Sequence, residues 1–529
     1  MEENHENYKD GEGLSLLKKG QKGLFAIIFS RLSIIVLLFA FQLFLLFATI
    51  RWFTQFLPHL FAFSVLVDAI MVPILLNSRI DPTAQITWLM VIMVMPVFGA
   101  LLYLYTRSDI GHRAMRQLVR ERNEQNLRRI KQSPAVLQQL EEENAHAAAL
   151  VRYMRRSGCY PVYDRTAVTY FPLGQDKWAQ MLVELEKAEQ FIFMEYFIID
   201  EGLMWGKVLE ILVRKAKAGV EVRLLYDGTN EFSTLPHNYP ERLRKLGIQC
   251  EMFAPLRPFL STHYNYRDHR KILVIDGHTA FTGGINLADE YINRREKHGY
   301  WKDTAVMLKG EAVKSFTLMF LQMWHMSDKD AEYDRYLAAP THAPEQAKGF
   351  VIPYGDCPVD EDKLGERVYL DILNHARHYV HIMTPYLILD SEMENALIYA
   401  AQRGVDVRII MPGVPDKEMA YALAKTYYPA LLDAGVRIYE FTPGFVHAKV
   451  FTCDDDTAVV GTINLDYRSL YHHFECAAYL YKTDCIGQIE ADFQQTLKQC
   501  KRVSMETLKN EPLKRRIMGP MLKVIAPLL

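Results

Sequence analysis

The chain lacks the cysteine pattern of a disulfide-stabilised or zinc-binding protein. Its seven cysteines are scattered through 529 residues, and no two of them form a CxxC pair. An odd, widely spaced set of cysteines argues against a disulfide framework and against a structural zinc site. We therefore expect most of the chain to lie in a reducing, cytosolic environment.

Net charge is also nearly absent, because the formal charge is only -2 at pH 7. Domains that bind nucleic acid in bulk are usually strongly basic, so no nucleic-acid partner is expected. The sequence also has no HExxH motif and no carboxylate cluster that would hold a catalytic ion. We expect neither a metal nor a cofactor. The length allows two or three domains.

Long apolar runs are present, but only near the start of the chain. They cover residues 24–50, 56–76 and 85–105. Each has about 20 residues or more, which is enough for a helix to cross the hydrocarbon core of a bilayer. A secretory signal peptide would have one shorter run. The sequence therefore predicts a transmembrane helical anchor over 24–106, preceded by a tail over 1–23.

Basic residues after the last run indicate the orientation. Residues 107–131 contain eight Arg or Lys against three Asp or Glu, which places everything after residue 106 in the cytoplasm. Lys18, Lys19 and Lys22 favour a cytoplasmic N-terminus as well. Three spans cannot satisfy both ends, so the number of spans and the side of the tail stay open. We expect a multi-pass protein of the cell membrane, with a helical connector over 107–160.

The rest of the chain contains one pattern twice. FIFMEYFIID (191–200) resembles VHIMTPYLILD (380–390), and HRKILVIDGHTAFTGGINLADE (269–290) matches HAKVFTCDDDTAVVGTINLDYR (447–468). A common order at a nearly constant separation indicates duplication. Each copy alternates β-rich runs with helical stretches, which is typical of an α/β fold. We expect two homologous α/β halves, 161–349 and 350–529, packed about a pseudo-two-fold axis.

The chemical residues lie in the last element of each copy, at 263–290 and 441–468. Each copy has the pattern HxKxxxxD followed by GxxN, and the residues are His269, Lys271, Asp276 and Asn286 in the first copy and His447, Lys449, Asp454 and Asn464 in the second. On a strand, the His and Lys of one motif point to the same face. One HxKxxxxD is expected by chance roughly once in 10,000 positions, so two are not accidental. The two aspartates either take part directly or anchor a loop.

This doubled motif resembles the signature of the phospholipase D superfamily. FAPLRPFLSTHYNYRDHRKI and the apolar segment SRIDPTAQITWLMVIMVMPVFGALLYLY are similar to bacterial cardiolipin synthases, and the resemblance covers roughly residues 75–529. It implies two phospholipase D-like halves with both motifs at their interface and no metal. Gly284 and Thr462 depart from the pattern, because many superfamily members have Ser at these positions.

The resemblance implies a double displacement at phosphorus. One histidine forms a phosphohistidine and the other protonates the leaving alcohol. The resemblance favours His269 as the nucleophile and His447 as the acid, although the symmetry of the motifs leaves the assignment open. The motif lysines and asparagines would bind the non-bridging oxygens. Asp303 and Glu475 stand where superfamily members carry a carboxylate that orients histidine, and a strand-edge surface acid is the other interpretation of Asp303.

The implied reaction transfers a phosphatidyl group from one phosphatidylglycerol to another and gives cardiolipin and glycerol. The expected partners are phosphatidylglycerol and other membrane lipids, and the catalytic part faces the cytoplasm. Basic residues at 107–131 and 514–516 would attract anionic lipid. The alternatives are a phospholipase D that uses water, a transferase with another alcohol acceptor, a nuclease, and a catalytically dead membrane scaffold. The oligomeric state stays open.

Overall fold

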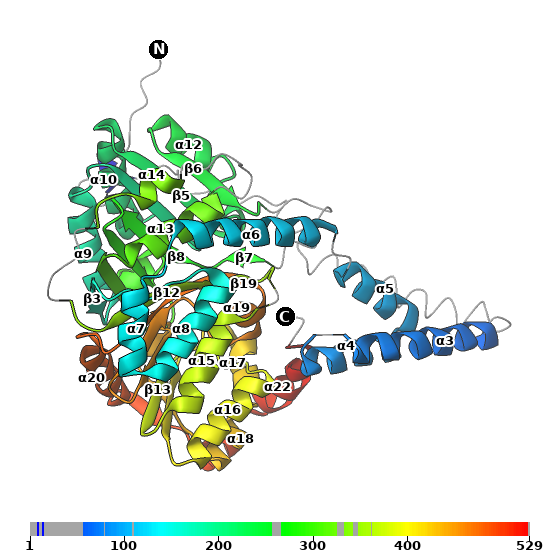
Figure 1. Ribbon diagram of the computed structural model, residues 1–529. Coiled ribbons are helices and arrows are strands. Elements are labelled where there is room, and N and C mark those ends of the chain that lie inside the picture. The colour runs from blue at the N-terminus through cyan, green and yellow to red at the C-terminus, as the bar shows by residue number, and fades with distance from the viewer. Residues whose placement is uncertain are drawn as a thin grey trace. The chain divides into compact units, whose positions relative to one another are not determined.

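The computed structural model describes residues 8–9, 13–14, 57–78, 80–107, 110–255, 266–324, 333–341, 347–360 and 362–526. The chain forms two compact units. The smaller unit contains the helices between residues 57 and 107, and the larger unit contains both copies of the repeated sequence (Figure 1). A short antiparallel pair, β1 (Tyr8–Lys9) and β2 (Gly13–Leu14), comes first in the chain.

The smaller unit consists of three apolar helices, α3 (Leu57–Leu76), α4 (Pro82–Val94) and α5 (Pro96–Arg107). Asp81 begins α4, because its carboxylate accepts hydrogen bonds from the amides of Thr83 and Ala84. The helices pack around a small apolar core made of Met71, Leu75, Trp88, Ile92, Ala100 and Tyr103. The core is small because most apolar side chains of these helices point outward.

The apolar run 85–105, expected as a single helix, is divided in the structure. Helix α4 ends at Val94 and α5 begins at Pro96. Proline has no N–H group and its ring collides with the preceding turn, so it begins a helix more readily than it continues one. Gly99 then allows close packing, since a Cβ atom there would lie 2.9 Å from the Ile92 Cα atom. The run therefore forms two helices that contact each other.

The other two apolar runs have different outcomes. The run 56–76 corresponds to α3. The predicted span 24–50 lies outside the described residues. Over the residues that the structure does describe, no helix combines the length and the apolar character needed to cross a bilayer.

Three helices occupy the region expected as a connector. They are α6 (Ile110–Arg129), α7 (Pro134–Glu143) and α8 (Ala145–Gly158). Ser133 and Asn144 cap α7 and α8 by accepting hydrogen bonds from the first free amides of each helix. The buried face of α8 carries Ala147, Leu150 and Val151, and this helix is part of the larger unit.

The first half is a seven-stranded sheet with the strand order β3-β11-β9-β8-β4-β5-β6. Strand β4 pairs in parallel with β5 and antiparallel with β8. The elements are β3 (Thr166–Phe171), α9 (Gly174–Glu186), β4 (Phe191–Tyr196), α10 (Leu203–Lys217), β5 (Glu221–Asp227), α11 (Asn230–Ser233), α12 (Tyr239–Lys245), β6 (Gln249–Phe253), β8 (Lys271–Ile275), β9 (Thr279–Gly283), η2 (Asp289–Ile292), β11 (Ala305–Gly310), α13 (Val313–Trp324) and α14 (Tyr333–Leu337).

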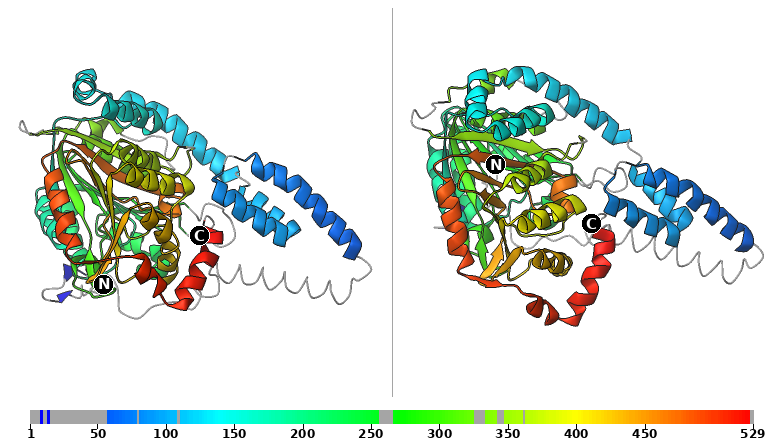
Figure 2. Two further views of the ribbon diagram at one scale, coloured as in Figure 1. Left: turned by 90° about the horizontal axis from the view of Figure 1, so that it is seen from below. Right: turned by 60° about the horizontal axis from the view of Figure 1, so that its bottom comes forward.

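The second half repeats this arrangement with the order β12-β19-β18-β17-β13-β14-β15-β20. Its elements are β12 (Phe350–Asp356), α15 (Leu364–His375), β13 (Tyr379–Met383), α16 (Ser391–Gln402), β14 (Asp406–Pro412), α17 (Glu418–Ala424), α18 (Tyr428–Asp433), β15 (Arg437–Phe441), β17 (Val450–Cys453), β18 (Thr457–Gly461), α19 (Tyr467–Tyr471), β19 (His473–Tyr481), α20 (Ile486–Leu497), β20 (Cys500–Arg502), α21 (Met505–Lys509) and α22 (Leu513–Ile525). The predicted α/β fold with two similar halves is confirmed. Figure 2 shows the strands of both halves inside the larger unit, with helices around them.

Two short parallel ladders join the halves. Strand β7 (Arg267–Asp268) pairs with the first residues of β19, and β10 (Tyr300–Lys302) pairs with β16 (Gly444–Val446). In each ladder one strand leads directly into a motif histidine. The register of these ladders therefore determines which residues of the opposite half lie next to each motif histidine.

Candidate active site

Each motif histidine is fixed by the backbone of the opposite half. The amide of His269 donates to the carbonyl oxygen of Phe474 at 2.9 Å, and the amide of His447 donates to that of Lys302 at 2.7 Å. These two hydrogen bonds continue the ladders between the halves. The residue after each acceptor is an acid, Glu475 or Asp303. The backbone register thus brings a carboxylate from one half to the histidine of the other.

The side chains of the histidines and acids also pair across the two halves. His269 Nδ1 lies 2.9 and 3.0 Å from the two carboxylate oxygens of Glu475, and His447 Nδ1 lies 2.7 Å from Asp303 Oδ2. Both acids are completely buried. An ionised carboxylate only accepts hydrogen bonds, so Nδ1 carries the proton and Nε2 keeps its lone pair. The structure therefore presents two imidazoles whose Nε2 atoms are available for reaction.

The motif lysines lie beside the histidines of their own half. Lys271 Nζ donates to the His269 carbonyl oxygen at 2.5 Å, Lys449 Nζ donates to that of His447, and both side chains are buried. Burial lowers the pKa of Lys271 to about 8 and that of Lys449 to about 7, although the nearby carboxylates oppose the shift. Two ammonium groups in one buried site form a receptor for an anion.

Burial and the lysines also keep the histidines neutral. The pKa of His269 is held well below its ordinary value by burial and by the charge of Lys271. Burial and Lys449 lower the pKa of His447 to about 4, against the attraction of Asp303. Burial raises the pKa of Glu475, while Lys271 and the hydroxyl of Thr462 oppose this shift.

The two motif asparagines are held differently. Asn286 Oδ1 accepts from the Ile198 amide at 3.0 Å, and its Nδ2 donates to the Tyr291 hydroxyl at 2.7 Å. One Nδ2 hydrogen of Asn286 is left over, because an amide has two. Asn464 is buried, and its Oδ1 is unpaired within the described structure. Both side chains come three residues after the glycine that ends β9 or β18.

Asp276 and Asp454 do not join this group. The carboxylate of Asp276 accepts the amides of residues 189–191, all at 2.8 Å, and Asp454 accepts those of residues 377–379 at 2.7–2.9 Å. These amides lead into β4 and β13. At about 3.3 Å per strand residue, Asp276 lies roughly 17 Å along β8 from Lys271. These contacts favour the anchoring interpretation, in which each aspartate holds the start of a central strand.

Sequence reasoning missed the purpose of the Gly284 and Thr462 departures. A Cβ atom on Gly284 would lie 2.1 Å from Asp303 Oδ1, so the carboxylate occupies the space of a side chain. In the other half, the Thr462 hydroxyl donates to Glu475. No signal in one sequence connects these residues, since the partners come from different strands.

His473 and Trp301 were missed as well. The His473 ring lies 5.5 Å from that of His269, and the Trp301 ring lies 5.5 Å from that of His447. Each stands two residues before the orienting acid, and residues two apart on a strand share a face. That spacing could have identified them. The two motifs are nearly equivalent, but His269 has the His473 imidazole beside it, whereas His447 has the Trp301 indole.

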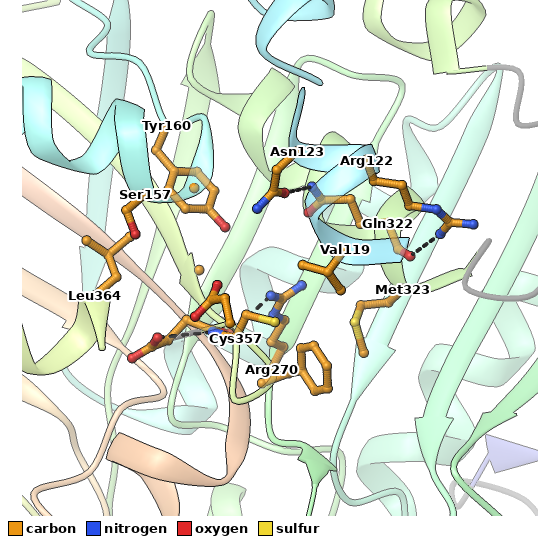
Figure 3. A pocket seen from close by; sticks show the side chains of 15 residues that line it. Val119, Arg122, Asn123, Ser157, Tyr160, Arg270, Gln322, Met323, Cys357 and Leu364 are labelled. Carbon is orange, nitrogen blue, oxygen red and sulfur yellow. Dashed lines mark hydrogen bonds between the residues drawn. The ribbon is translucent and has the colours of Figure 1, made fainter. Parts of the chain in front are cut away.

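Arg270, between the motif His and Lys, faces the opposite side of its strand. Its guanidinium donates to the carbonyl oxygens of Glu475, Met319 and Asp356 at 3.1, 3.4 and 3.4 Å. Figure 3 shows it at the wall of a pocket of about 40 Å³ that Tyr160 also lines. Arg270 ties the motif strand to both halves from behind the histidines.

Comparison with known proteins agrees with this geometry. Residues 181–324 and 369–497 match the family described as "Cardiolipin synthase, PLD-like domain", and residues 60–107 match "Phospholipase_D-nuclease N-terminal". A phosphatidylserine synthase of Haemophilus influenzae has a similar fold, with a TM-score of 0.53 and 15% identity, over 72% of this chain and 97% of its own. The fold and the paired motifs define a phospholipase D-like enzyme.

Sequence identity to curated relatives shows which family of phospholipase D-like enzymes the chain belongs to. A cardiolipin synthase of Alkalihalophilus pseudofirmus is 33% identical over 90% of this chain and 95% of its own. "Cardiolipin synthase 2" of Bacillus anthracis is 35% identical over 86% of this chain and 88% of its own. An uncharacterised Streptococcus mutans protein is 59% identical over 86% of this chain and 98% of its own. The chain belongs to the cardiolipin synthase family, and it is a phosphatidyltransferase.

Replacing either orienting acid by its amide tests the cross-half pairs. Glu475→Gln and Asp303→Asn keep the volume but can offer an N–H group to Nδ1, which favours the wrong imidazole tautomer. We expect phospholipid turnover to fall by roughly 10³–10⁴-fold, as for a comparable change in a catalytic triad. Circular dichroism should show an intact fold. Turnover within tenfold of the parent would contradict the orienting role.

Removing the charge of Asp276 or Asp454 should affect stability and not chemistry. Asp276→Asn and Asp454→Asn weaken three charge-assisted hydrogen bonds, and we expect a loss of about 2–4 kcal/mol in unfolding free energy. Denaturant unfolding and the specific activity of the folded fraction are the measurements. Asp455→Asn is the matched control, because Asp455 is exposed and its carboxylate accepts a hydrogen bond from the Tyr379 hydroxyl. A 100-fold loss of activity at unchanged stability would restore a catalytic role.

The lowered pKa values of the two lysines predict how kcat/KM changes at alkaline pH. A group with a lowered pKa is charged below that value and neutral above it, so Lys449 and Lys271 lose charge as the pH rises through about 7 and about 8. We expect kcat/KM to fall over this range, because this ratio reports ionisations of the free enzyme. Measurement between pH 6 and 9.5 tests this. A constant value up to pH 9 would show that neither ammonium charge is needed.

Proposed function

We propose that this enzyme is a cardiolipin synthase that moves a phosphatidyl group from one phosphatidylglycerol to a second and releases glycerol. One observation carries the proposal. Two neutral imidazoles, each oriented by the acid of the other half, share a buried site with two lysines. Such a site suits exchange of two alcohols at a phosphodiester, because it supplies a nucleophile, an acid and charge for the phosphate. The names of the curated relatives support the lipid substrates.

In the first step, His269 Nε2 attacks the phosphorus of the donor lipid. The P–N bond forms, the P–O bond to glycerol breaks, and His447 transfers a proton to the departing oxygen. Burial and neighbouring cations keep His269 neutral, as a nucleophile requires. Binding of the anionic phosphodiester raises the pKa of His447, and Asp303 stabilises its protonated form.

In the second step, the hydroxyl of another phosphatidylglycerol attacks the phosphohistidine. His447 takes the hydroxyl proton, the new P–O bond forms, and the P–N bond to His269 breaks. Lys271, Lys449 and the amide hydrogens of the motif asparagines bind the non-bridging oxygens. Loss of one such donor typically costs about 3 kcal/mol of transition-state stabilisation.

Helix α22 supports a location at the bilayer surface. Its residues Leu513, Ile517, Met521 and Val524 lie on one face and are 68%, 55%, 68% and 42% exposed. The opposite face is buried and includes Gly519 and Leu522. Exposed Lys514 and Arg516 flank the apolar face. An apolar stripe beside cations suits an interfacial helix on anionic lipid.

The smaller unit supports the same location. Helices α3, α4 and α5 expose many large apolar side chains, which are Phe63, Val65, Leu66, Ile70, Ile74, Leu76, Ile86, Met90, Met93, Val94, Val97, Leu101 and Leu104. Soluble proteins rarely expose so much contiguous apolar surface. We propose that these helices contact lipid and that the loop charges place the catalytic unit on the cytoplasmic side.

The test uses full-length protein in phosphatidylglycerol vesicles, with lipid products and free glycerol measured together. We expect cardiolipin and glycerol in equal amounts, and a loss of at least about 10³-fold in His269→Ala and His447→Ala. His237→Ala, at an exposed site in the same half, is the control. Phosphatidic acid without cardiolipin would make water the acceptor, and no turnover would make the chain a scaffold.

A further inference from the structure

A loop of the second half carries a cation that the mechanism above does not use. Residues 413–417 follow β14, and Lys417 lies at the end of this loop, directly before α17. Its side chain is 66% exposed, and Nζ lies 4.0 Å from Asp416 Oδ2. That separation is too long for a hydrogen bond, so the N–H donors of Lys417 have no acceptor among the described residues.

The loop lies beside the strand that leads to the second motif histidine. The amides of Gly413 and Val414 donate to the carbonyl oxygen of Gly444 at 3.2 and 3.1 Å. Gly444 begins β16, and this strand ends at Val446, directly before His447. The loop is therefore held next to the histidine that moves the proton in the proposed mechanism.

Tyr386 holds the loop from a second strand. Its hydroxyl donates to Asp416 Oδ2 at 2.6 Å, and its ring centroid lies 5.1 Å from Lys417 Nζ. Tyr386 follows the end of β13, and the last residue of β13 pairs with the residue after Lys449. Lys417 thus lies over the same edge of the sheet from which the motif lysine projects.

The charge of Lys417 reaches the interior of the site. Asp466 is a buried acid two residues after the motif asparagine of this half. Burial raises the pKa of Asp466, and the charges of Lys417, Arg468 and Lys449 oppose this shift. One buried carboxylate therefore interacts with the motif lysine and with the cation of the loop. An anion bound at Lys417 would be close to a phosphate at the motif lysines, but separate from it.

Asn464 offers an unused hydrogen-bond acceptor in the same half. In the first half the matching atom, Asn286 Oδ1, accepts from the Ile198 amide at 3.0 Å. Asn464 Oδ1 is buried and has no donor within the described structure. A buried acceptor without a donor is unfavourable, and the hydroxyl of a bound ligand would satisfy it. The two motifs therefore differ at the atom that can accept a hydrogen bond from substrate.

The second step of the proposed mechanism brings two phosphates into the site together. The acceptor phosphatidylglycerol has a phosphodiester of its own, separated from the attacking hydroxyl by the glycerol head group. Lys271 and Lys449 then bind the phosphoryl group on His269, so the acceptor phosphate needs another cation. An ammonium group binds phosphate through charge-assisted hydrogen bonds. Water and free glycerol have no phosphate and gain nothing from such a cation.

We propose that Lys417 and Asn464 form the subsite for the head group of the acceptor lipid. Lys417 Nζ binds the acceptor phosphate, and Asn464 Oδ1 accepts a hydrogen bond from the glycerol hydroxyl that does not react. The inference rests on the proposed function. The subsite holds the attacking hydroxyl beside His447 and favours a phospholipid acceptor over water or free glycerol.

Labelled glycerol tests the subsite, because it is an acceptor without a phosphate. Full-length protein in phosphatidylglycerol vesicles receives labelled glycerol, and cardiolipin and labelled phosphatidylglycerol are measured together. Both transfers use the same phosphohistidine, so the ratio of the two products reports the choice of acceptor. We expect Lys417→Gln to lower the ratio of cardiolipin to labelled phosphatidylglycerol about fivefold, as for the loss of one exposed ion pair. Lys417→Glu should lower it by at least about tenfold, because like charges repel, and Lys417→Arg should retain it.

Lys498→Gln is the matched control, because it removes another exposed lysine of the same half, one that donates to Gln495 at 3.2 Å. It should leave the ratio at the parental value. An unchanged ratio in Lys417→Glu would overturn the subsite and leave the synthase function intact. An equal fall in both transfers would also overturn it, because the damage would then lie in the shared chemistry. A parent that labels phosphatidylglycerol but forms no cardiolipin would overturn the proposed function and the subsite with it.

Discussion

The active site depends on a reciprocal exchange between the two halves. The amides of His269 and His447 each donate to the opposite half, one residue before the acid that orients the imidazole. A half without its partner would lack the acid that orients its histidine and the carbonyl oxygen that accepts its amide hydrogen. The site is therefore complete only when both halves are in contact.

Near-symmetry suits the proposed mechanism, because each of its steps needs one imidazole to bond phosphorus and the other to move a proton. The environments still differ. Glu475 accepts the Thr462 hydroxyl, whereas Asp303 occupies the space that Gly284 leaves free. His269 has a second imidazole beside it, and His447 has an indole. These differences give each histidine its own proton affinity, so the two roles need not be interchangeable.

Sequence predicted the features that depend on local spacing. The repeat revealed two halves, and the i, i+2 rule brought His269 and Lys271 together, because strand geometry is local. The pairing of His447 with Asp303 depends on register between distant strands, and only the family resemblance indicated it. Pro96 is also a local signal, and it could have predicted the division of the apolar run 85–105 into two helices. The His146–Asp371 contact joins residues 225 positions apart, for which no local pattern exists.

Charge balance explains how substrate binding prepares the acid. Burial and the neighbouring lysines keep both histidines neutral. A bound phosphodiester adds one negative charge, and a proton on His447 restores the balance. The pKa of about 4 for this histidine is thus compatible with its proposed role as an acid, because this value belongs to the site without the anion. The substrate itself makes protonation favourable, and departure of the lipid product reverses it.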